Sequence, residues 1–276
     1  MLELSAVERH YTRGNLAERI LEGLHKSGKD NGRPRPEDLA AVDQFHIRGR
    51  AATLELAKVA GIQPGWSVLD VGGGIGGAAR LLASRLRCQV TVLDLTDEFV
   101  RTGAMLCERM DLAGLVHFRH GSALDMPFDR ERFDVVWTQH STMNIANKDR
   151  LYDEAHRVLR PRGRLAMHEV VAGPVEPACY PVPWAVDEST SFLLPQAQLR
   201  TLIARFGFRE LAWQDTTAAS LEWFKRVALP PLPQASPPPL GLHLLLGDTA
   251  AAMLRGQALN LEERRLEVVQ AVFERP

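Results

Sequence analysis

The residues Val68-Leu69-Asp70-Val71-Gly72-Gly73-Gly74-Ile75-Gly76-Gly77 are the strongest indication of fold class in this chain. A short apolar run, typical of a buried strand, ends in residues that permit positive φ and close backbone approach, and a helical pattern follows at once. In open α/β sheets such a strand-to-helix turn binds nucleotide-like ligands at the carboxyl end of the strand. The stretch therefore predicts a ligand loop. The alternative is a tight turn that binds nothing.

Outward from this loop, short β-branched runs alternate with helical patterns, as in a doubly wound parallel sheet. Helices are expected near 76–86, 97–113, 147–160, 196–206 and 245–262, and the earlier ones are long enough to cross between parallel strands. The expected strands are Ser67–Val71, Gln89–Leu95, Val116–His120, Phe133–Gln139, Arg164–Val170, a strand near 208–216 and Glu267–Phe273.

Segments outside the alternation predict additions to one main domain. Residues 1–60 have helical spacing and are expected to form an N-terminal helical cap on a domain that covers 61–276. Prolines and aromatic residues near 171–194 indicate an ordered lid, because aromatic residues argue against disorder. Residues 217–265 are expected to form a helical insert, which includes a stiff Pro-rich surface loop at Pro230–Pro239.

Composition narrows the class of partner. The formal net charge of −1, with basic and acidic residues interspersed, argues against nucleic acid. Three widely spaced cysteines fit neither a disulfide framework nor a metal site, so we expect a cytoplasmic protein without a structural metal. The sequence contains no uninterrupted apolar stretch of roughly 18 residues, so it predicts no membrane span. Monomer and homodimer both remain open.

The glycines fit two cofactor patterns, G-x-G-x-x-G from Gly72 and D-x-G-x-G-x-G from Asp70. A carboxylate at Asp70 would face a bound pyrophosphate unfavourably, but it suits the ammonium group of a methionine moiety. Asp94 ends the next apolar run and is placed to accept hydrogen bonds from ribose hydroxyls, which either cofactor requires. The pattern favours S-adenosylmethionine (SAM). An NAD(P)-dependent oxidoreductase is the alternative, although no Tyr-x-x-x-Lys pair supports it.

Five motifs, in this order, carry a family resemblance: VLDVGGGIGG (68–77), VLDL (92–95), GSALDMPF (121–128), FDVVWTQH (133–140) and VLRPRGRL (158–165). From about Phe45 to Trp223 the chain resembles class I SAM-dependent methyltransferases, particularly the small-molecule branch with sarcosine/dimethylglycine and tocopherol-type enzymes. The resemblance implies an α/β, Rossmann-like seven-stranded sheet, mostly parallel with an antiparallel last strand. Helices are expected on both faces, beside the N-terminal helices and the helical insert.

The resemblance also implies SAM as cofactor and S-adenosylhomocysteine (SAH) as product. Ser122 stands where the family often carries Asp, so a backbone contact or Asp125 is expected to meet the adenine instead. Gln44 and His46 are expected near the methionine part. The residues expected to hold the cofactor are Asp70, Gly72, Gly73, Gly74, Asp94, Leu95, Ser122, Ala123, Gln139 and Gln44.

Methyl transfer needs alignment and exclusion of water, and an amine acceptor must also lose a proton. His140, which follows the fourth strand, is the first candidate base, and His46 and the His168-Glu169 pair come next. The alternative for each is a polar residue satisfied by local hydrogen bonds. Residues expected to shape the acceptor pocket, with lid packing as the alternative, are Met143, Asn144, Tyr180, Trp184, Phe192 and Glu169.

The methylated atom follows only from the resemblance, which favours an amine nitrogen of a small molecule over carbon, oxygen or sulfur. Methylation of nucleic-acid amino groups is disfavoured, because Thr138-Gln139-His140-Ser141 stands where those enzymes usually carry an Asn/Asp-Pro-Pro-aromatic motif. A cofactor-binding protein without catalysis is the remaining alternative.

Overall fold

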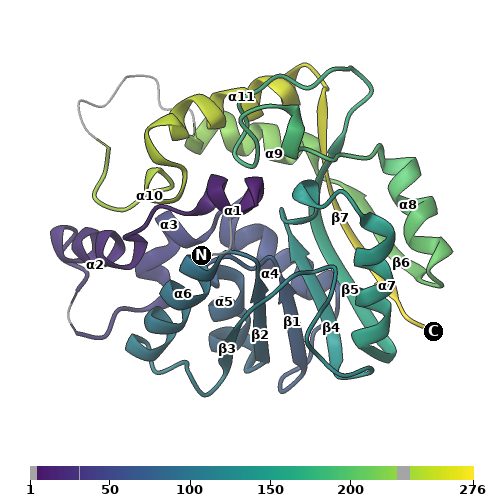
Figure 1. The fold of residues 1–276 in the computed structure, drawn as a ribbon, viewed down its shortest axis with the longest axis horizontal. Coiled ribbons are helices and arrows are strands. Elements are labelled where there is room, and N and C mark those ends of the chain that lie inside the picture. The colour runs from purple at the N-terminus through teal and green to yellow at the C-terminus, as the bar shows by residue number, and fades with distance from the viewer. Residues whose placement is uncertain (1–4, 31, 229–236) are drawn as a thin grey trace.

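The computed structural model describes residues 5–30, 32–228 and 237–276, which form an α/β fold around one seven-stranded sheet (Figure 1). The strand order is β3-β2-β1-β4-β5-β7-β6. Only β7 runs against its neighbours, between β5 and β6, so the predicted sheet with its antiparallel last strand is confirmed. The strands are β1 (Ser67–Val71), β2 (Gln89–Asp94), β3 (Val116–His120), β4 (Phe133–Gln139), β5 (Leu159–Ala172), β6 (Arg209–Asp215) and β7 (Leu266–Glu274).

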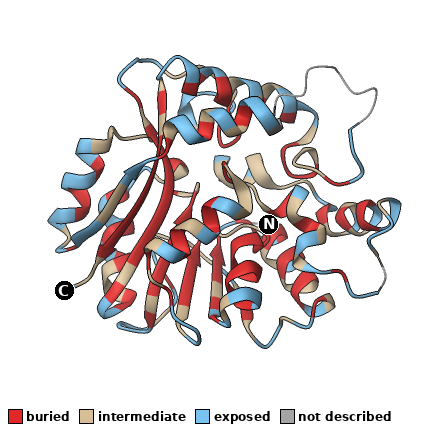
Figure 2. Ribbon diagram, turned by 180° about the vertical axis from the view of Figure 1, so that it is seen from behind, coloured by how far each residue is buried: buried red, intermediate tan, exposed pale blue. Residues whose placement is uncertain are grey.

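The central strands are apolar because helices cover both of their faces, and Figure 2 shows them buried along most of their length. One face packs against α7 (Lys148–Val158) and α8 (Gln196–Arg205). The other packs against α4 (Gly49–Val59), α5 (Gly77–Leu86) and α6 (Asp97–Arg109).

Strand β5 begins five residues earlier than the sequence pattern predicts, at Leu159 instead of Arg164. Leu159 pairs with Phe133, whereas Arg164 already pairs with Val135, so the residues between bulge out of the ladder. Arg162 has a positive φ of 64° in this bulge. The Pro161-Arg162-Gly163 part of the VLRPRGRL motif therefore forms a turn inside a strand.

The N-terminal residues form helices that lie over the carboxyl ends of the strands (Figure 1). Leu16, Ile20 and Leu24 occupy one side of α2 and pack with Leu244 and Leu245 of the later segment. These helices are α1 (Ala6–Tyr11), α2 (Leu16–Lys26), the 3₁₀ turn η1 (Pro36–Leu39) and α3 (Ala40–Asp43).

Between β6 and β7 the chain forms the expected helices, which cross above the sheet beside the N-terminal helices (Figure 1). The single helix predicted near 245–262 is divided, because Gly247 has φ of 72°. The elements are α9 (Thr217–Trp223), the π-helix η4 (Phe224–Ala228), α10 (His243–Leu246), η5 (Gly247–Thr249) and α11 (Ala250–Glu262). Of the expected Pro-rich loop, residues 230–236 lie outside the described residues.

The segment expected to form a lid contacts this insert, because Val182 and Trp184 share an apolar cluster with Phe224 and Leu261. Trp184 is buried and its indole N–H donates to Ser191 Oγ at 3.0 Å. Asn144, in the 3₁₀ turn η2 (Thr142–Asn144), donates from Nδ2 to the carbonyl oxygens of Trp184 and Thr190 at 2.9 and 2.8 Å. A second 3₁₀ turn, η3 (Glu188–Thr190), lies within the lid. Among the described residues, no helix has the length and apolar character of a membrane span.

Candidate functional site

Two adjoining cavities open at the carboxyl ends of the strands, and they share Phe45, His46 and His140 in their linings. The first, here called the glycine-loop cavity, is lined by Asp43, Phe45, His46, Asp70, Gly72, Gly73, Gly74, Ile75, Ala78, Phe99, Gln139, His140 and Leu245. The second, here called the aromatic cavity, is lined by Tyr11, Phe45, His46, Ile47, His140, Met143, Pro183, Trp184, Trp223, Phe224, Leu242, Leu254 and Gln257.

The glycine loop adopts a backbone that only glycine takes readily. Gly72 has φ of 69° and its N–H donates to Leu93 O at 2.7 Å, which ties the loop to β2. A Cβ on Gly72 would overlap the side chain of Ser141. The strand-to-helix turn therefore brings bare backbone to the floor of the cavity.

Asp70 presents an unbonded carboxylate oxygen to this cavity. The residue is 1% exposed, and its Oδ2 atom has no hydrogen-bond partner in the described part of the chain. Burial, with a smaller contribution from the nearby Asp94 carboxylate, raises the pKa of Asp70 to about 7. A buried acceptor of this kind is complementary to a ligand that brings a cationic donor.

Asp94 is fixed by two backbone N–H groups. Gly74 N donates to its Oδ2 atom at 2.8 Å and Thr96 N donates to its Oδ1 atom at 2.8 Å. Burial raises the pKa of Asp94, while these two hydrogen bonds favour its charged form. Each carboxylate oxygen keeps a further lone pair, so Asp94 can still accept hydrogen bonds from vicinal hydroxyls.

Gln139 offers the opposite polarity to the same cavity. Its Oε1 atom accepts hydrogen bonds from Trp137 Nε1 at 3.0 Å and from Thr53 Oγ1 at 3.1 Å. These two donors fix the orientation of the amide, and Gln139 Nε2 is buried without a partner among the described residues. The cavity thus holds a free acceptor at Asp70 and a free donor at Gln139, which together match an amino acid zwitterion.

A buried ion pair, missed by the sequence reasoning, attaches the N-terminal segment to the glycine loop. Arg80 of α5 donates to Asp43 Oδ2 at 2.8 Å, and both side chains are at most 1% exposed. Arg80 also donates to Ile75 O at 2.6 Å, and a Cβ on Gly77 would overlap the Asp43 carbonyl oxygen. An arginine within the apolar run of residues 77–86 was the available signal, because such a buried cation requires a partner.

Three buried histidines from different elements meet where the two cavities join. The ring centroids of His140 and His168 are 4.8 Å apart, and the His46 ring lies 6.3 Å and 6.1 Å from them. His140 has φ of 51°, and its N–H donates to His168 O at 2.9 Å. No group of described residues has an arrangement suited to a metal ion.

Burial favours the neutral form of these histidines. His46 Nε2 lies 3.1 Å from Gly49 O, which only accepts, and 2.9 Å from Thr53 Oγ1, whose proton is directed to Gln139 Oε1. This nitrogen therefore carries the proton. Burial lowers the pKa of His46 to about 4 and holds the pKa values of His140 and His168 well below their usual range, and the neighbouring histidines lower the latter two further. Within the described chain, His140 Nε2 and both ring nitrogens of His168 have no partner. His140, which lines both cavities, can therefore accept a proton.

Glu169 points away from the histidines, because neighbouring strand residues face opposite sides of a sheet. Burial raises its pKa to about 7, and its Oε2 atom accepts the Thr142 N–H at 3.3 Å. Lys148 of α7 lies on the same face, and burial lowers its pKa to about 8. Neither residue lines either cavity.

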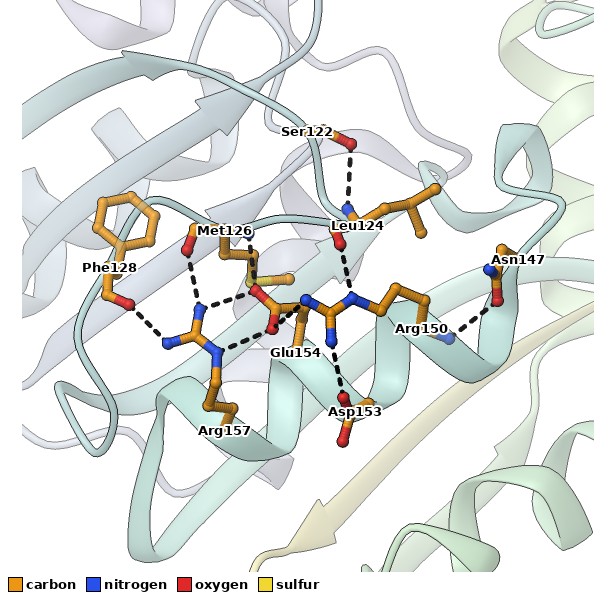
Figure 3. Close-up of polar contacts among 9 residues, drawn as sticks. All are labelled: Ser122, Leu124, Met126, Phe128, Asn147, Arg150, Asp153, Glu154 and Arg157. Atoms are coloured by element: carbon orange, nitrogen blue, oxygen red, sulfur yellow. Dashed lines mark hydrogen bonds and ion pairs between the residues drawn. The ribbon is translucent and has the colours of Figure 1, made fainter.

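The loop after β3, where Ser122 and Ala123 were expected beside the adenine, is held by side chains of α7 (Figure 3). Arg150 Nε donates to Leu124 O at 2.9 Å, and Glu154 Oε2 accepts the Met126 N–H at 2.7 Å. Arg157 donates to the carbonyl oxygens of Met126 and Phe128 at 2.8 and 2.7 Å. One helix therefore fixes the path of the whole loop.

The cavities contain part of the predicted site. The glycine-loop cavity includes Asp70, Gly72, Gly73, Gly74 and Gln139, and the aromatic cavity includes Met143 and Trp184. The predicted residues outside both linings are Gln44, Asp94, Leu95, Ser122, Ala123, Asn144, Glu169, Tyr180 and Phe192. The sequence reasoning missed Tyr11, Phe45, Trp223, Phe224, Leu242, Leu245, Leu254 and Gln257, of which only the adjacent aromatic pair at 223–224 carries a visible signal.

Comparison with known proteins agrees with this geometry. Residues 69–167 match the family model described as a methyltransferase domain. The chain is 32% identical over 136 residues to the glycine/sarcosine/dimethylglycine N-methyltransferase of Actinopolyspora halophila, a match that covers 49% of this chain and 23% of that protein. It is 35% identical over 118 residues to the erythromycin 3″-O-methyltransferase of Saccharopolyspora erythraea, covering 42% and 39%.

Among solved structures, the fold matches the geranyl diphosphate C-methyltransferase of Streptomyces coelicolor A3(2) with a TM-score of 0.66 and 18% identity, over 83% of this chain and 79% of that one. This chain spans less than half of the length of each of the two curated relatives. The names of these two relatives and of the solved structure cover methyl transfer to nitrogen, oxygen and carbon. The matches therefore favour the methyltransferase interpretation and leave the acceptor atom open.

Proposed function

The chain belongs to the class I SAM-dependent methyltransferases, and from this premise we propose that it methylates an amine nitrogen of a small molecule. One observation supports the proposal most strongly. His46, His140 and Phe45 line both the glycine-loop cavity and the aromatic cavity, so the two spaces meet at these side chains. In-line methyl transfer requires such an arrangement, with donor and acceptor held in contact on opposite sides of the methyl group.

The glycine-loop cavity fits SAM. The unpartnered Oδ2 atom of Asp70 suits the methionine ammonium group, and the unpartnered Nε2 atom of Gln139 suits its carboxylate. Asp94 is held in position to accept hydrogen bonds from the ribose hydroxyls. When bound, SAM supplies a methyl group on a sulfonium whose sulfur is already an activated leaving group, so the protein needs mainly to orient the acceptor and exclude water.

The amine must lose a proton as the new N–C bond forms, and His140 is the residue that receives it at Nε2. This atom is unpartnered in the described structure, and burial keeps the ring neutral. Burial is the main reason why the pKa of His140 is low, and the nearby His46 lowers it further. A positioned histidine base is typically worth about 10²- to 10⁴-fold in rate.

Two substitutions are expected to separate cofactor binding from proton transfer. Asp94→Ala is expected to weaken SAM and SAH binding about a hundredfold, since it removes a buried charged acceptor. His140→Ala is expected to leave SAM affinity within a few-fold of wild type and to lower kcat at least about a hundredfold. Calorimetry with SAM, and SAH release in the presence of an accepted amine, measure the two quantities.

The control is Asp97→Ala, because Asp97 lies close in sequence but is exposed on α6 and pairs only with Arg101 among the described side chains. SAM affinity should stay at the wild-type value in this variant. Equal SAM affinity in wild type and Asp94→Ala would remove the ribose assignment, and NADH binding tighter than SAM binding would overturn the proposal as a whole. Wild-type turnover in His140→Ala would assign the base elsewhere.

A further inference from the structure

The aromatic cavity has a chemical character that limits its ligand. Five rings line it, together with five apolar side chains, and it contains about 400 Å³ of empty space, part of it open to solvent. Its polar side chains are His46, His140, Gln257 and Tyr11, whose hydroxyl donates to Asn144 Oδ1 at 3.0 Å, and among the described residues no Lys, Arg, Asp or Glu lines it. The rings are Tyr11, Phe45, Trp184, Trp223 and Phe224.

Three cations on the surrounding elements are engaged elsewhere, and Lys225, Arg226 and Arg255, which lie next to lining residues in the sequence, are exposed. Lys148 Nζ donates to Thr142 O at 2.8 Å and to Ile145 O at 3.0 Å. Arg13 Nε donates to Leu245 O of α10 at 2.8 Å, and Arg48 forms a 2.5 Å ion pair with Glu55 of α4. The histidines are neutral. A carboxylate or phosphate on the acceptor would therefore enter the aromatic cavity without a charged partner.

An unpaired anion is costly in such surroundings, because desolvation of an ionised group is not repaid by hydrogen bonds or a counter-ion. The same rings favour apolar groups through burial, and they attract an alkylammonium product through cation–π interaction. The lining thus selects for an apolar body with one amino group, and selects against amino acids and phosphorylated amines.

We propose that the acceptor is an arylalkyl or alkyl amine that carries no carboxylate, phosphate or other anionic group. This inference rests on the proposed function, since it takes the aromatic cavity as the acceptor side of the methyl-transfer site. The amino group lies toward His140, where the two cavities join, and the apolar body lies among Trp184, Trp223 and Phe224.

Matched pairs of compounds test this inference, because tryptamine and tryptophan, or phenethylamine and phenylalanine, differ only in one carboxylate. Each compound is titrated calorimetrically into the SAH-bound protein. Tryptamine is expected to bind at least tenfold more tightly than tryptophan, and phenethylamine at least tenfold more tightly than phenylalanine. Equal or tighter binding of the amino acids would overturn the inference, as would failure of both amines to bind at millimolar concentration.

A matched pair of variants locates the binding site. Trp223→Ala removes a ring from the cavity lining and is expected to weaken tryptamine binding about tenfold without changing SAH affinity. Trp213→Ala is the control, because Trp213 lies on β6, bonds to Gln196 and lines neither cavity. Wild-type tryptamine affinity in Trp223→Ala would also overturn the inference.

The experiment separates this inference from the proposed function. SAH binding is measured first, and its absence would count against the proposed function. The amine titrations are then repeated on the SAH-free protein, since the lining of the aromatic cavity consists of protein side chains. Amine preference without SAH binding would preserve the cavity assignment alone, whereas SAH binding with amino acid preference would overturn the inference and leave the methyltransferase proposal standing.

Discussion

Asp70 ends β1 with one carboxylate oxygen buried and without a partner among the described residues, and its pKa is raised to about 7. In the unfolded chain the same group titrates at its ordinary pKa of about 3.9. Between these values the folded state binds more protons than the unfolded state, so this residue makes the free energy of unfolding fall as pH rises from about 4 to 7. A residue suited to a cationic ligand thereby destabilises the ligand-free fold at neutral pH.

We expect Asp70→Asn to raise the free energy of unfolding of the ligand-free protein at pH 8 by an amount on the order of 2 kcal/mol, and to change it little at pH 4. The same variant should lose about a hundredfold in SAM affinity, because the amide carries no charge for the ammonium group. Wild-type SAM affinity should decrease as pH falls below about 7, since Asp70 must ionise to pair. Denaturant unfolding and calorimetry across this pH range measure these effects, and a stability gap that is the same at pH 4 and pH 8 would contradict the argument.

At this scale the sequence indicates residues whose chemistry is visible in a motif. Asp70 and Gln139 line the glycine-loop cavity, because their positions at strand ends follow from the alternation of strands and helices, and their role in holding a cofactor stays a prediction. Asp43 and Arg80 were missed, since their pairing joins segments 37 residues apart whose meeting no local pattern specifies. The assignment of Ser122 and Ala123 to the adenine stays a prediction.

Helix α7 shows how one element fixes another. Its side chains bond the backbone of the loop after β3 at several points (Figure 3). Hydrogen bonding with Arg157 is the main reason why the pKa of Glu154 is lowered. The loop therefore keeps its conformation through side chains outside itself, which pre-organises it for a ligand.

Arg150→Ala is expected to weaken SAM binding several-fold while changing the free energy of unfolding by less than about 1 kcal/mol, because this half-exposed side chain bonds the loop at Leu124 O. Arg205→Ala is the matched control, since Arg205 of α8 forms an ion pair with Asp149 of α7 and bonds no loop residue in the described structure. Calorimetry and denaturant unfolding of both variants test the effect. Similar SAM affinities in the two variants would show that the loop does not need this contact.

Element boundaries were predicted well where hydrophobic periodicity is strong, as in β1, β3 and β4, which agree with the structure at both ends. The predicted start of β5 was wrong, because a bulge between Leu159 and Arg164 lets the strand begin before the turn. The helix near 245–262 was predicted whole because the positive φ of Gly247 is invisible in an otherwise helical pattern. Hydrophobic periodicity therefore does not predict local conformations that depend on neighbouring elements.

The glycine-loop cavity is covered by two segments that lie about 200 residues apart in the sequence. Asp43, Phe45 and His46 come from the N-terminal segment, and Leu245 comes from α10. Their apolar contacts form one cluster with α2 and α6. The sequence predicted a cap and an insert, but their division into units stays a prediction, and which of their residues meet depends on tertiary packing that spacing does not encode.

SAH is therefore expected to slow amide hydrogen exchange in residues 40–49 and 241–247 together, because ligand contacts stabilise both parts of this cover. Helix α8 serves as an internal control, since it packs on the opposite face of the sheet and lines neither cavity. Exchange measured by mass spectrometry with and without SAH tests this. Protection confined to the glycine loop would show that the cover does not respond to the ligand.

The position of β7 between β5 and β6 has a consequence for biosynthesis. Both neighbours precede β7 in the chain, so β6 has no strand to pair with until residues 266–274 have left the ribosome. Until then β5 presents an open apolar edge on the nascent chain, which is the kind of edge that other unfinished chains add to. The sheet is therefore complete only after β7 has been made, and the edge of β5 stays exposed on the nascent chain while the residues between β6 and β7 are synthesised.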